Sequence, residues 1–202
     1  MPHDAKTLRQ VAKLHATCIN QGFLSSLGPR FLTVLYRAID RCDAAVLIVE
    51  GNGMGVTGFV TGGSGMGPIY RKMLRDWPAL IAALAPVIVQ PRKVMGIIEV
   101  LRRGGGDIDK DLPQHELFSI AVAPAVRGSG TADKLYQALC THFDDQGIPA
   151  FRIVVGDTLT PAHRFYTRMG GKPVTTLRLH GEATSTIYAQ KIADKGDAGR
   201  GL

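Results

Sequence analysis

Long apolar runs, cysteine and tryptophan are all scarce in this 202-residue chain. The longest apolar stretch, residues 79–89, contains Pro86 and is too short to span a bilayer. The N-terminal segment is polar, so we expect no signal peptide. The three cysteines are too far apart for a metal-ligand spacing and do not form an even set for disulfides: Cys18, Cys42 and Cys140. We therefore expect a cytoplasmic protein with reduced thiols and no metal.

Runs of like charge are also missing. No five consecutive residues carry the same sign, and no basic stripe is interleaved with aromatic residues, so we expect no nucleic-acid partner. What the chain does have is a net charge of +7 and a pI near 9.5. A basic surface favours anionic partners such as phosphorylated cofactors or nucleotide-linked substrates.

The first third of the chain predicts two helices followed by a β-hairpin. Apolar residues recur at helical spacing in 5–19 and again in 31–39, with a turn region at 22–29 between them. Residues 44–50 and 56–62 are apolar strands separated by the turn sequence GNGMG. Helices followed by paired strands indicate an α+β fold.

Residues 63–113 differ from their surroundings, because amphipathic helical segments punctuated by prolines fill them. Too few residues remain on either side for two independent domains, so we expect one domain over 1–202 with a helical insertion at 63–113. The bases of this segment either form a solvated face or cover an anionic ligand, and contact of 67–103 with a membrane surface is a further alternative. Residues 193–202 lack apolar periodicity and are expected to be a disordered tail.

The second half alternates strands with helices. The predicted elements are a strand at 115–124, a helix at 129–147, a strand at 150–157, a helix at 160–171 and a strand pair at 173–182 and 185–192.

A glycine-rich turn, residues 127–130, joins the strand at 115–124 to the helix that follows. A dinucleotide-binding turn needs a third glycine where this chain has Asp133, and a P-loop needs a GK[ST] sequence that is missing. Such turns also occur without any ligand. The remaining interpretation is a phosphate cradle: glycines let backbone amides approach a pyrophosphate, a helix N-terminus adds positive charge, and Arg127 adds a cation.

Two motifs favour the cradle. Residues 122–132 read V-x-P-x-x-R-G-x-G-x-A, and a second set follows on the next predicted helix: Ala162, Phe165, Tyr166 and Gly170. Together they resemble motifs A and B of the GNAT superfamily of N-acetyltransferases, and the specific part of the resemblance covers 116–171.

The resemblance implies a central, twisted, mostly antiparallel mixed sheet with flanking helices, in which strands 115–124 and 150–157 splay apart. It implies acetyl-CoA as co-substrate between these strands, without a metal. The residues that it assigns to acetyl-CoA binding, largely through their backbone amides, are Ile120, Val122, Arg127, Gly128, Ser129, Gly130, Thr131 and Ala132.

The same resemblance makes Tyr166 the general acid for the departing thiolate. The alternative is a structural tyrosine whose hydroxyl bonds to backbone. Glu116 is our candidate for the base, because burial in a cleft raises the pKa of a carboxyl group; otherwise it is a rim carboxylate in an ion pair. His115 points to the opposite face of a regular strand and is the weaker candidate.

Three features depart from the family pattern. Leu159 stands where the family has an asparagine that holds the pantetheine arm, and Gly171 replaces a phenylalanine. The insertion at 63–113 stands where many members have only a short loop.

The resemblance puts the acceptor amine beside the first two helices and their connecting turn, 21–28, where Phe23, Ser25 and Ser26 offer contacts. We interpret His15 as a core or surface histidine. The basic segment favours a small anionic amine, such as a nucleotide-linked amino sugar. Acetylation of a protein N-terminus or lysine, a non-catalytic acyl-CoA-binding module, and a homodimer stay open.

Overall fold

The structure is a computed structural model that describes residues 2–19, 23–86, 112–178 and 184–192. Its elements are, in chain order, α1 (Ala5–Cys18), α2 (Phe23–Ser26), α3 (Gly28–Asp40), β1 (Ala45–Asn52), β2 (Gly55–Gly63), α4 (Met66–Arg75), α5 (Trp77–Leu84), β3 (His115–Val122), the 3₁₀ turn η1 (Pro124–Val126), α7 (Thr131–Asp145), β4 (Ala150–Gly156), α8 (Thr160–Arg168), β5 (Lys172–Arg178) and β6 (Thr184–Lys191).

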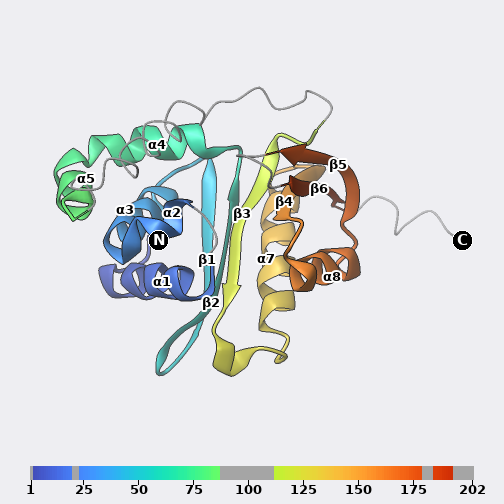
Figure 1. The fold of residues 1–202 in the computed structure, drawn as a ribbon, viewed down its shortest axis with the longest axis horizontal. Coiled ribbons are helices and arrows are strands. Elements are labelled where there is room, and N and C mark those ends of the chain that lie inside the picture. Colours follow the sequence, from blue (N-terminus) through green and yellow to red (C-terminus); the bar gives the residue numbers. More distant parts are fainter. Residues whose placement is uncertain (1, 20–22, 87–111, 179–183, 193–202) are drawn as a thin grey trace, which may run out of the picture.

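The strands of the described residues form one six-stranded sheet in the order β1-β2-β3-β4-β6-β5. Neighbouring strands are antiparallel except β3 and β4, which run parallel. Helices α1 and α3 cover one face, with α4 packed on α3, and α7 and α8 cover the other (Figure 1). The prediction of an α+β fold with a mostly antiparallel mixed sheet and flanking helices is confirmed.

Local chemistry explains where several elements begin and turn. Asp4 caps α1, because its carboxylate accepts a hydrogen bond from the Thr7 amide at 2.7 Å. In the hairpin between β1 and β2, the side-chain oxygen of Asn52 accepts a bond from the Met54 amide at 3.0 Å. Gly130, with φ at 80°, precedes α7 in a conformation that glycine adopts without steric cost.

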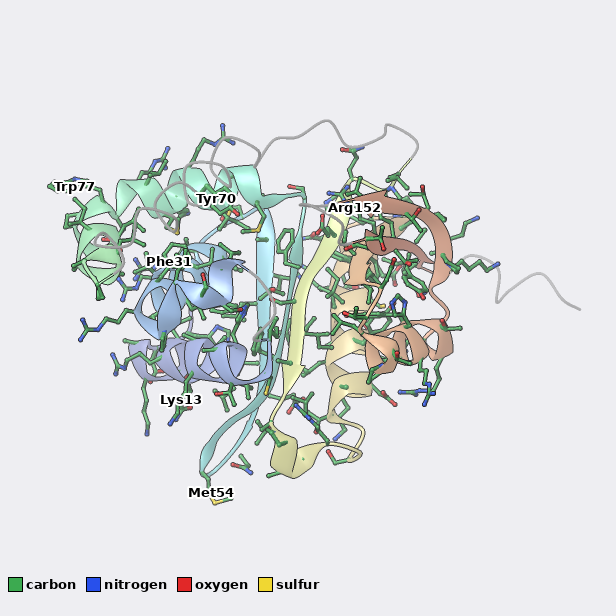
Figure 2. The ribbon with its side chains drawn as sticks, viewed as in Figure 1. Lys13, Phe31, Met54, Tyr70, Trp77 and Arg152 are labelled. Atoms are coloured by element: carbon green, nitrogen blue, oxygen red, sulfur yellow. The ribbon has the colours of Figure 1, made fainter. Side chains whose placement is uncertain are left out.

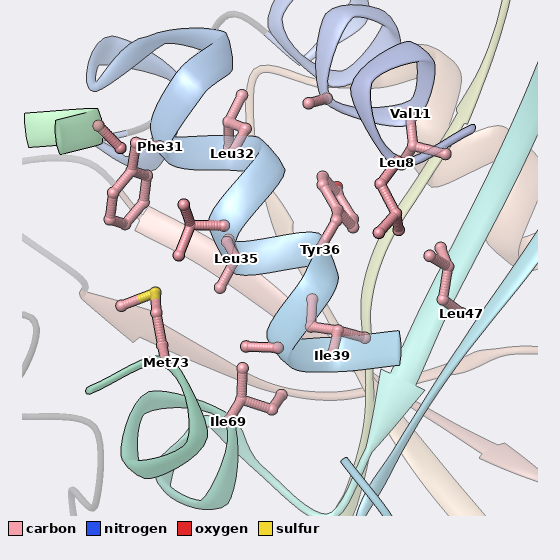
Figure 3. Close-up of a cluster of buried hydrophobic side chains, with 14 of the residues drawn as sticks. Leu8, Val11, Phe31, Leu32, Leu35, Tyr36, Ile39, Leu47, Ile69 and Met73 are labelled. Atoms are coloured by element: carbon pink, nitrogen blue, oxygen red, sulfur yellow. The ribbon is translucent and has the colours of Figure 1, made fainter. Parts of the chain in front are cut away.

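The first hydrophobic core lies between the sheet and helices α1, α3 and α4 (Figure 3). Tyr36 of α3 is at its centre, and its ring meets the Phe59 ring of β2 edge to face at 5.1 Å. A fully buried aliphatic side chain contributes roughly 1.5–3 kcal/mol. The buried side chains labelled in Figure 3 are Leu8, Val11, Phe31, Leu32, Leu35, Tyr36, Ile39, Leu47, Ile69 and Met73.

The second core lies on the opposite face of the sheet, under α7 and α8. Phe143 of α7 packs against Phe151 of β4 at 5.2 Å, and Leu117 of β3 joins them. Strand β3 is therefore held from both faces, because Ala121 belongs to the first core.

Most boundaries shift by a few residues from the sequence prediction, and two of the shifts have a clear cause. The turn predicted at 22–29 contains the single helical turn α2, and α3 begins at Gly28, since Pro29 is compatible with the first turn of a helix. The strand predicted at 115–124 ends at Val122, because Pro124 begins η1.

The described part of the segment 63–113 is helical, as α4 and α5. Its remainder, 87–111, lies outside the described residues, and so does the tail predicted at 193–202. That the segment is an insertion stays a prediction. None of the described helices is both long enough and apolar enough to cross a membrane.

Gly63, at the end of β2, tests how closely β2 packs against the start of β1. A Cβ at Gly63 would lie 2.3 Å from the carbonyl oxygen of Ala44, whereas one at Gly53 in the hairpin turn would meet nothing within 4 Å. We expect Gly63→Ala to lower the free energy of unfolding by roughly 1–3 kcal/mol. Gly53→Ala is the matched control and should change it by no more than about 0.5 kcal/mol. Urea denaturation measures both, and equal midpoints would contradict the close approach.

Candidate active site

Strands β3 and β4 pair over only a short stretch of the described structure. The parallel ladder joins His115, Glu116 and Leu117 to the β4 residues 151–153. Beyond that point β3 continues along β2 as far as Val122 without a β4 partner. Figure 1 accordingly shows β4 beside the upper end of β3. The two strands splay apart as predicted, which exposes one backbone edge of β3 at residues 118–122.

A β-bulge lies at the point where the strands part. Thr61 of β2 pairs with Ser119 and Gly62 pairs with Leu117, so Phe118 is the extra residue. Leu117 and Ile120 pack under α7, whereas Phe118 packs with the first core. The bulge therefore bends β3 where it leaves β4.

The predicted cradle follows the free end of β3. Gly128 and Gly130 both have φ at 80°, and a Cβ at either position would meet nothing within 4 Å. The carbonyl of Gly130 accepts the Lys134 amide at 3.0 Å, which leaves the amides of residues 131–133 at the start of α7 without an intrahelical acceptor. The turn therefore offers backbone N–H groups and open space, which fits a pyrophosphate.

The two hydroxyl groups of the cradle bond to the protein itself. Ser129 donates to the carbonyl of Val126 at 2.7 Å and is 2.8 Å from the Thr131 hydroxyl. Because the Ser129 proton is directed at Val126, Thr131 is the donor to Ser129. Neither hydroxyl proton is left for a ligand, so amides rather than side-chain hydroxyls are the donors of this turn.

Arg127 supplies the cation of the cradle. Its side chain is exposed, and one guanidinium nitrogen lies 3.9 Å from the Cys18 sulfur at the end of α1. The structure gives Arg127 no carboxylate partner among the residues it describes. The nearby Asp133 accepts two bonds from Arg168, at 2.7 and 3.0 Å, so its charge is compensated.

Tyr166 projects from α8 into the second core. It is 6% exposed, and its ring lies 6.1 Å from Tyr136 and 6.3 Å from Tyr188. Burial raises the pKa of Tyr166, so the phenol is protonated at neutral pH. None of the residues that the structure describes bonds to this hydroxyl. Every fully buried polar side-chain atom described has a partner, so the small exposure of Tyr166 must include its oxygen.

Gly171 explains one departure from the family motif. Its amide donates to the carbonyl of Tyr166 at 2.9 Å, and a Cβ at Gly171 would lie 3.0 Å from that same oxygen. A small residue here lets the chain turn tightly behind Tyr166.

The other departure, Leu159, puts an exposed apolar side chain before α8, and Leu159 gives the helix no side-chain cap. The polar groups nearby are engaged: His163 bonds to the Gly156 carbonyl at 3.2 Å and to the Tyr188 hydroxyl at 2.8 Å. Asp157 accepts bonds from Thr184 and Thr186 of β6. No side chain described here takes the place of the missing asparagine.

Glu116 forms an ion pair with Arg152, the residue opposite it on β4. One Glu116 carboxylate oxygen accepts bonds from Nε and Nη2 of Arg152 at 2.9 and 2.7 Å, and Arg152 also donates to the Pro113 carbonyl at 2.7 Å. Arg152 is 3% exposed. Figure 2 shows it at the end of the sheet where α4 carries Tyr70. Burial raises the pKa of Glu116, and the positive charge of Arg152 opposes that rise.

His115 and Glu116 point to opposite faces of β3. The His115 ring lies 5.6 Å from Phe143 of α7, and burial lowers its pKa. Glu116 faces the α4 side, where the burial of Tyr70 and, to a smaller extent, the negative charge of Glu116 raise the pKa of Tyr70 to about 12.

A chain of buried polar groups links β3 to α2, and the sequence did not reveal it. His15 Nδ1 lies 2.5 Å from the Tyr36 hydroxyl, which is 3.3 Å from the Ser119 hydroxyl at the bulge. On the other side His15 Nε2 lies 3.0 Å from Ser25, which donates to the Ile19 carbonyl.

Two observations together assign the protons in this chain. Because the Ser25 proton is given to Ile19, His15 Nε2–H must donate to Ser25. Burial lowers the pKa of His15 to about 4, so at neutral pH the ring carries this one proton and is uncharged. Its Nδ1 then accepts from Tyr36, and Ser119 donates to Tyr36. His15 was expected to be a core or a surface histidine, and the structure buries it in the core. The predicted Ser25 of the acceptor turn is one of its partners. Of the other two residues predicted there, Ser26 is exposed, and the structure does not describe the Phe23 side chain.

The low pKa of His15 predicts a pH dependence of stability. An ordinary histidine takes up its proton near pH 6.5, whereas folded His15 does so near pH 4. Between these values the unfolded chain binds more protons, so the free energy of unfolding falls as the pH is lowered from 6.5 towards 4.

We expect this contribution to be on the order of 2 kcal/mol between pH 7 and pH 4.5. His15→Gln removes it while other groups titrate alike in both proteins. The stability difference between wild type and His15→Gln in urea denaturation should therefore shrink by that amount at the lower pH. A difference that is independent of pH would overturn the assignment of a neutral, buried His15.

Comparisons with known proteins agree with this geometry. A family model described as Acetyltransferase (GNAT) family matches residues 63–171, which is more than half of the chain. No curated protein matches it in sequence. Among the part of the chain that the structure describes, no cluster of metal-ligating side chains is found.

Solved structures share the fold at low sequence identity. An N-acetyltransferase from Staphylococcus aureus Mu50 is 15% identical with a TM-score of 0.61, over 96% of this chain and 97% of that one. The ribosomal-protein-S18-alanine N-acetyltransferase of Escherichia coli is 12% identical with a TM-score of 0.58, over 98% and 95%. NAA60 of Arabidopsis thaliana, solved with acetyl-CoA, is 14% identical with a TM-score of 0.57, over 95% and 97%. The family model matches residues 63–171, and the parallel strands of the sheet part before the glycine cradle. This chain therefore belongs to the GNAT family of acetyltransferases and is an N-acetyltransferase.

Proposed function

We propose that this enzyme transfers the acetyl group of acetyl-CoA directly to a primary amine of a small anionic molecule, such as a nucleotide-linked amino sugar, within a ternary complex. The observation that carries the proposal is the parting of β3 from β4 after Leu117 and Ile153, next to the cradle. Burial raises the pKa of Cys140 to about 11, which keeps it a thiol and argues against an acyl intermediate on this residue.

The cradle residues would hold the pyrophosphate of acetyl-CoA. The amides of Gly128, Gly130, Thr131 and Ala132 supply donors, and the N-terminal end of α7 adds a partial positive charge. Arg127 adds a full charge. The unpaired edge of β3 at Ile120 and Val122 would bond the pantetheine arm, and Ser129 would support the turn through its bond to Val126.

Tyr166 would act as the general acid. Amine attack on the thioester carbonyl forms the amide bond and breaks the carbon–sulfur bond, and the leaving thiolate must take up one proton. The Tyr166 phenol is protonated, its hydroxyl has no protein partner among the described residues, and it retains a little access. These properties favour the acid role over a purely structural tyrosine.

Glu116 would take the proton that the amine loses. It faces away from the α7 side of the sheet, and its raised pKa brings a carboxylate closer to the working pH of a base. Its pairing with Arg152 also fits a purely structural role, so the role of Glu116 needs its own test.

The acceptor is inferred from charge. The net charge of +7 and the bases of α4 favour an anionic amine over a polyamine. A protein N-terminus is the alternative, since the ribosomal-protein acetyltransferase has the same fold. We also propose a cytoplasmic location, which the free cysteines Cys18, Cys42 and Cys140 support.

Turnover of acetyl-CoA with a panel of amines tests the function. We expect CoA release with phosphorylated amino sugars to exceed that with peptides bearing free N-termini, and no release without an amine.

Tyr166→Phe should lower kcat by about 10²-fold with unchanged affinity for acetyl-CoA, because the phenol acts only as sulfur leaves. Tyr136→Phe removes a neighbouring hydroxyl, bonded to Gln190, and is the matched control. If only peptides were acetylated, the acceptor would be a protein N-terminus and not a small molecule. If Tyr166→Phe kept full activity, Tyr166 would not be the general acid.

Arg152→Met tests Glu116 through its pKa. Arg152 lowers the pKa of Glu116, so its loss should raise that pKa. A base must be deprotonated, and the acidic limb of the kcat/KM profile should therefore move to higher pH. In Glu116→Gln the limb should vanish, with kcat lowered about 10²-fold. If the acidic limb of the kcat/KM profile stays at the same pH in a folded Arg152→Met protein, Glu116 is not the base and has only the structural role of the ion pair.

A further inference from the structure

A cleft of about 330 Å³ lies between α3 and α4. The last turn of α3 contributes Arg37, with Arg41 just after it, and the last turn of α4 contributes Lys72 and Arg75, with Asp76 just after it. The spacings i, i+4 on α3 and i, i+3 on α4 put each pair of bases on one side of its helix. Two pairs of bases therefore border the same cleft.

The positive charge of the cleft exceeds what its surroundings compensate. Asp76 is paired with Arg37 at 3.1 Å. No ion pair is found for Arg41, Lys72 or Arg75 among the residues that the structure describes. Bases near helix C-termini also stabilise the helix dipole, but two helix ends contribute only about one negative charge in total. Three uncompensated cations around one cleft favour an anion there.

The floor of the cleft strengthens such an interaction. Val34, Ala38 and Met73 line it and are all buried, so the cleft rests on the first hydrophobic core. Charge interactions next to an apolar floor are less screened than on an open surface. The volume is in the range of small-molecule sites, and guanidinium groups bind phosphate oxygens in a forked geometry.

The cleft is separate from the glycine cradle. It is made of α3 and α4, whereas the cradle follows η1 at the other end of β3 (Figure 1). We propose that this cleft is a second anion site that binds a phosphate group, independently of acetyl-CoA. The phosphate belongs either to a free metabolite or to a lipid headgroup. A lipid headgroup is a candidate because exposed apolar side chains lie close by in sequence, in α4 and α5: Leu74, Trp77 and Ile81.

Calorimetric titration with inorganic pyrophosphate, in the presence of excess CoA, tests the site. If the proposed function is right, CoA occupies the cradle and pyrophosphate cannot bind there. If it is wrong, comparison of a cleft variant with a control variant still shows whether pyrophosphate binds at the cleft. Arg41→Ser/Arg75→Ser removes two exposed, unpaired cations of the cleft. Arg9→Ser/Lys13→Ser removes two exposed cations from α1 and is the matched control for net charge.

We expect the cleft variant to weaken pyrophosphate binding at least about tenfold, and the control to change it less than twofold. Sedimentation with phosphatidylcholine vesicles, with and without phosphatidic acid, examines the lipid source. Binding to the acidic vesicles alone, lost in the cleft variant, would identify the headgroup as the phosphate donor. If wild type binds neither probe, or if both variants bind equally, the site does not exist.

Discussion

The short parallel pairing of β3 with β4 is the constraint on which the rest of the site depends. Parallel strands stay about 4.8 Å apart only while their ladder continues, and here it ends at Leu117 and Ile153. The bulge at Phe118 bends β3 there, and the cores on the two faces of the sheet hold the strand on its own course. At the paired end, the bonds between Glu116 and Arg152 fix the two strands to each other. The gap is thus produced by packing on both sides of it.

Most polar groups around this gap are already satisfied by the protein. Ser129 and Thr131 bond within the cradle, and Ser119 belongs to the chain that ends at Ile19. Groups held by internal bonds are preorganised, because they do not rotate to meet a ligand. The donors that stay available are backbone amides, the Arg127 guanidinium and the Tyr166 phenol, and these match the phosphate, amide and sulfur chemistry of a CoA thioester.

Elements and local conformations could be predicted from the sequence, but partners across the sheet could not. The glycine turn depends on residues that are adjacent in the chain, so its position between a strand and a helix could be predicted from local pattern, although α7 begins at Thr131 and not at residue 129. Ligand binding at Gly128 and Gly130 stays a prediction. The pairing of Glu116 with Arg152 depends on the β3–β4 register, which no local pattern contains. One signal was present: Arg152 is the single charge within the apolar strand at 150–156, and such a charge needs a buried partner. The link of Tyr36 to Ser119 joins residues 83 positions apart, and the link of His15 to Tyr36 joins two helices 21 positions apart. Neither gave a comparable signal in the sequence.

The two candidate catalytic residues lie on opposite faces of the sheet, which would separate the two proton transfers of the proposed reaction. Tyr166 lies in the core under α7, whereas Glu116 faces α4 and the side covered by α1 and α3. With the thioester in the gap between β3 and β4, the proposed roles would bring the amine in from the Glu116 side and release the sulfur on the Tyr166 side. Burial holds Tyr166 protonated, which is the state that the proposed acid requires before the acceptor binds. Burial also raises the pKa of Glu116, and the charge of Arg152 opposes that rise.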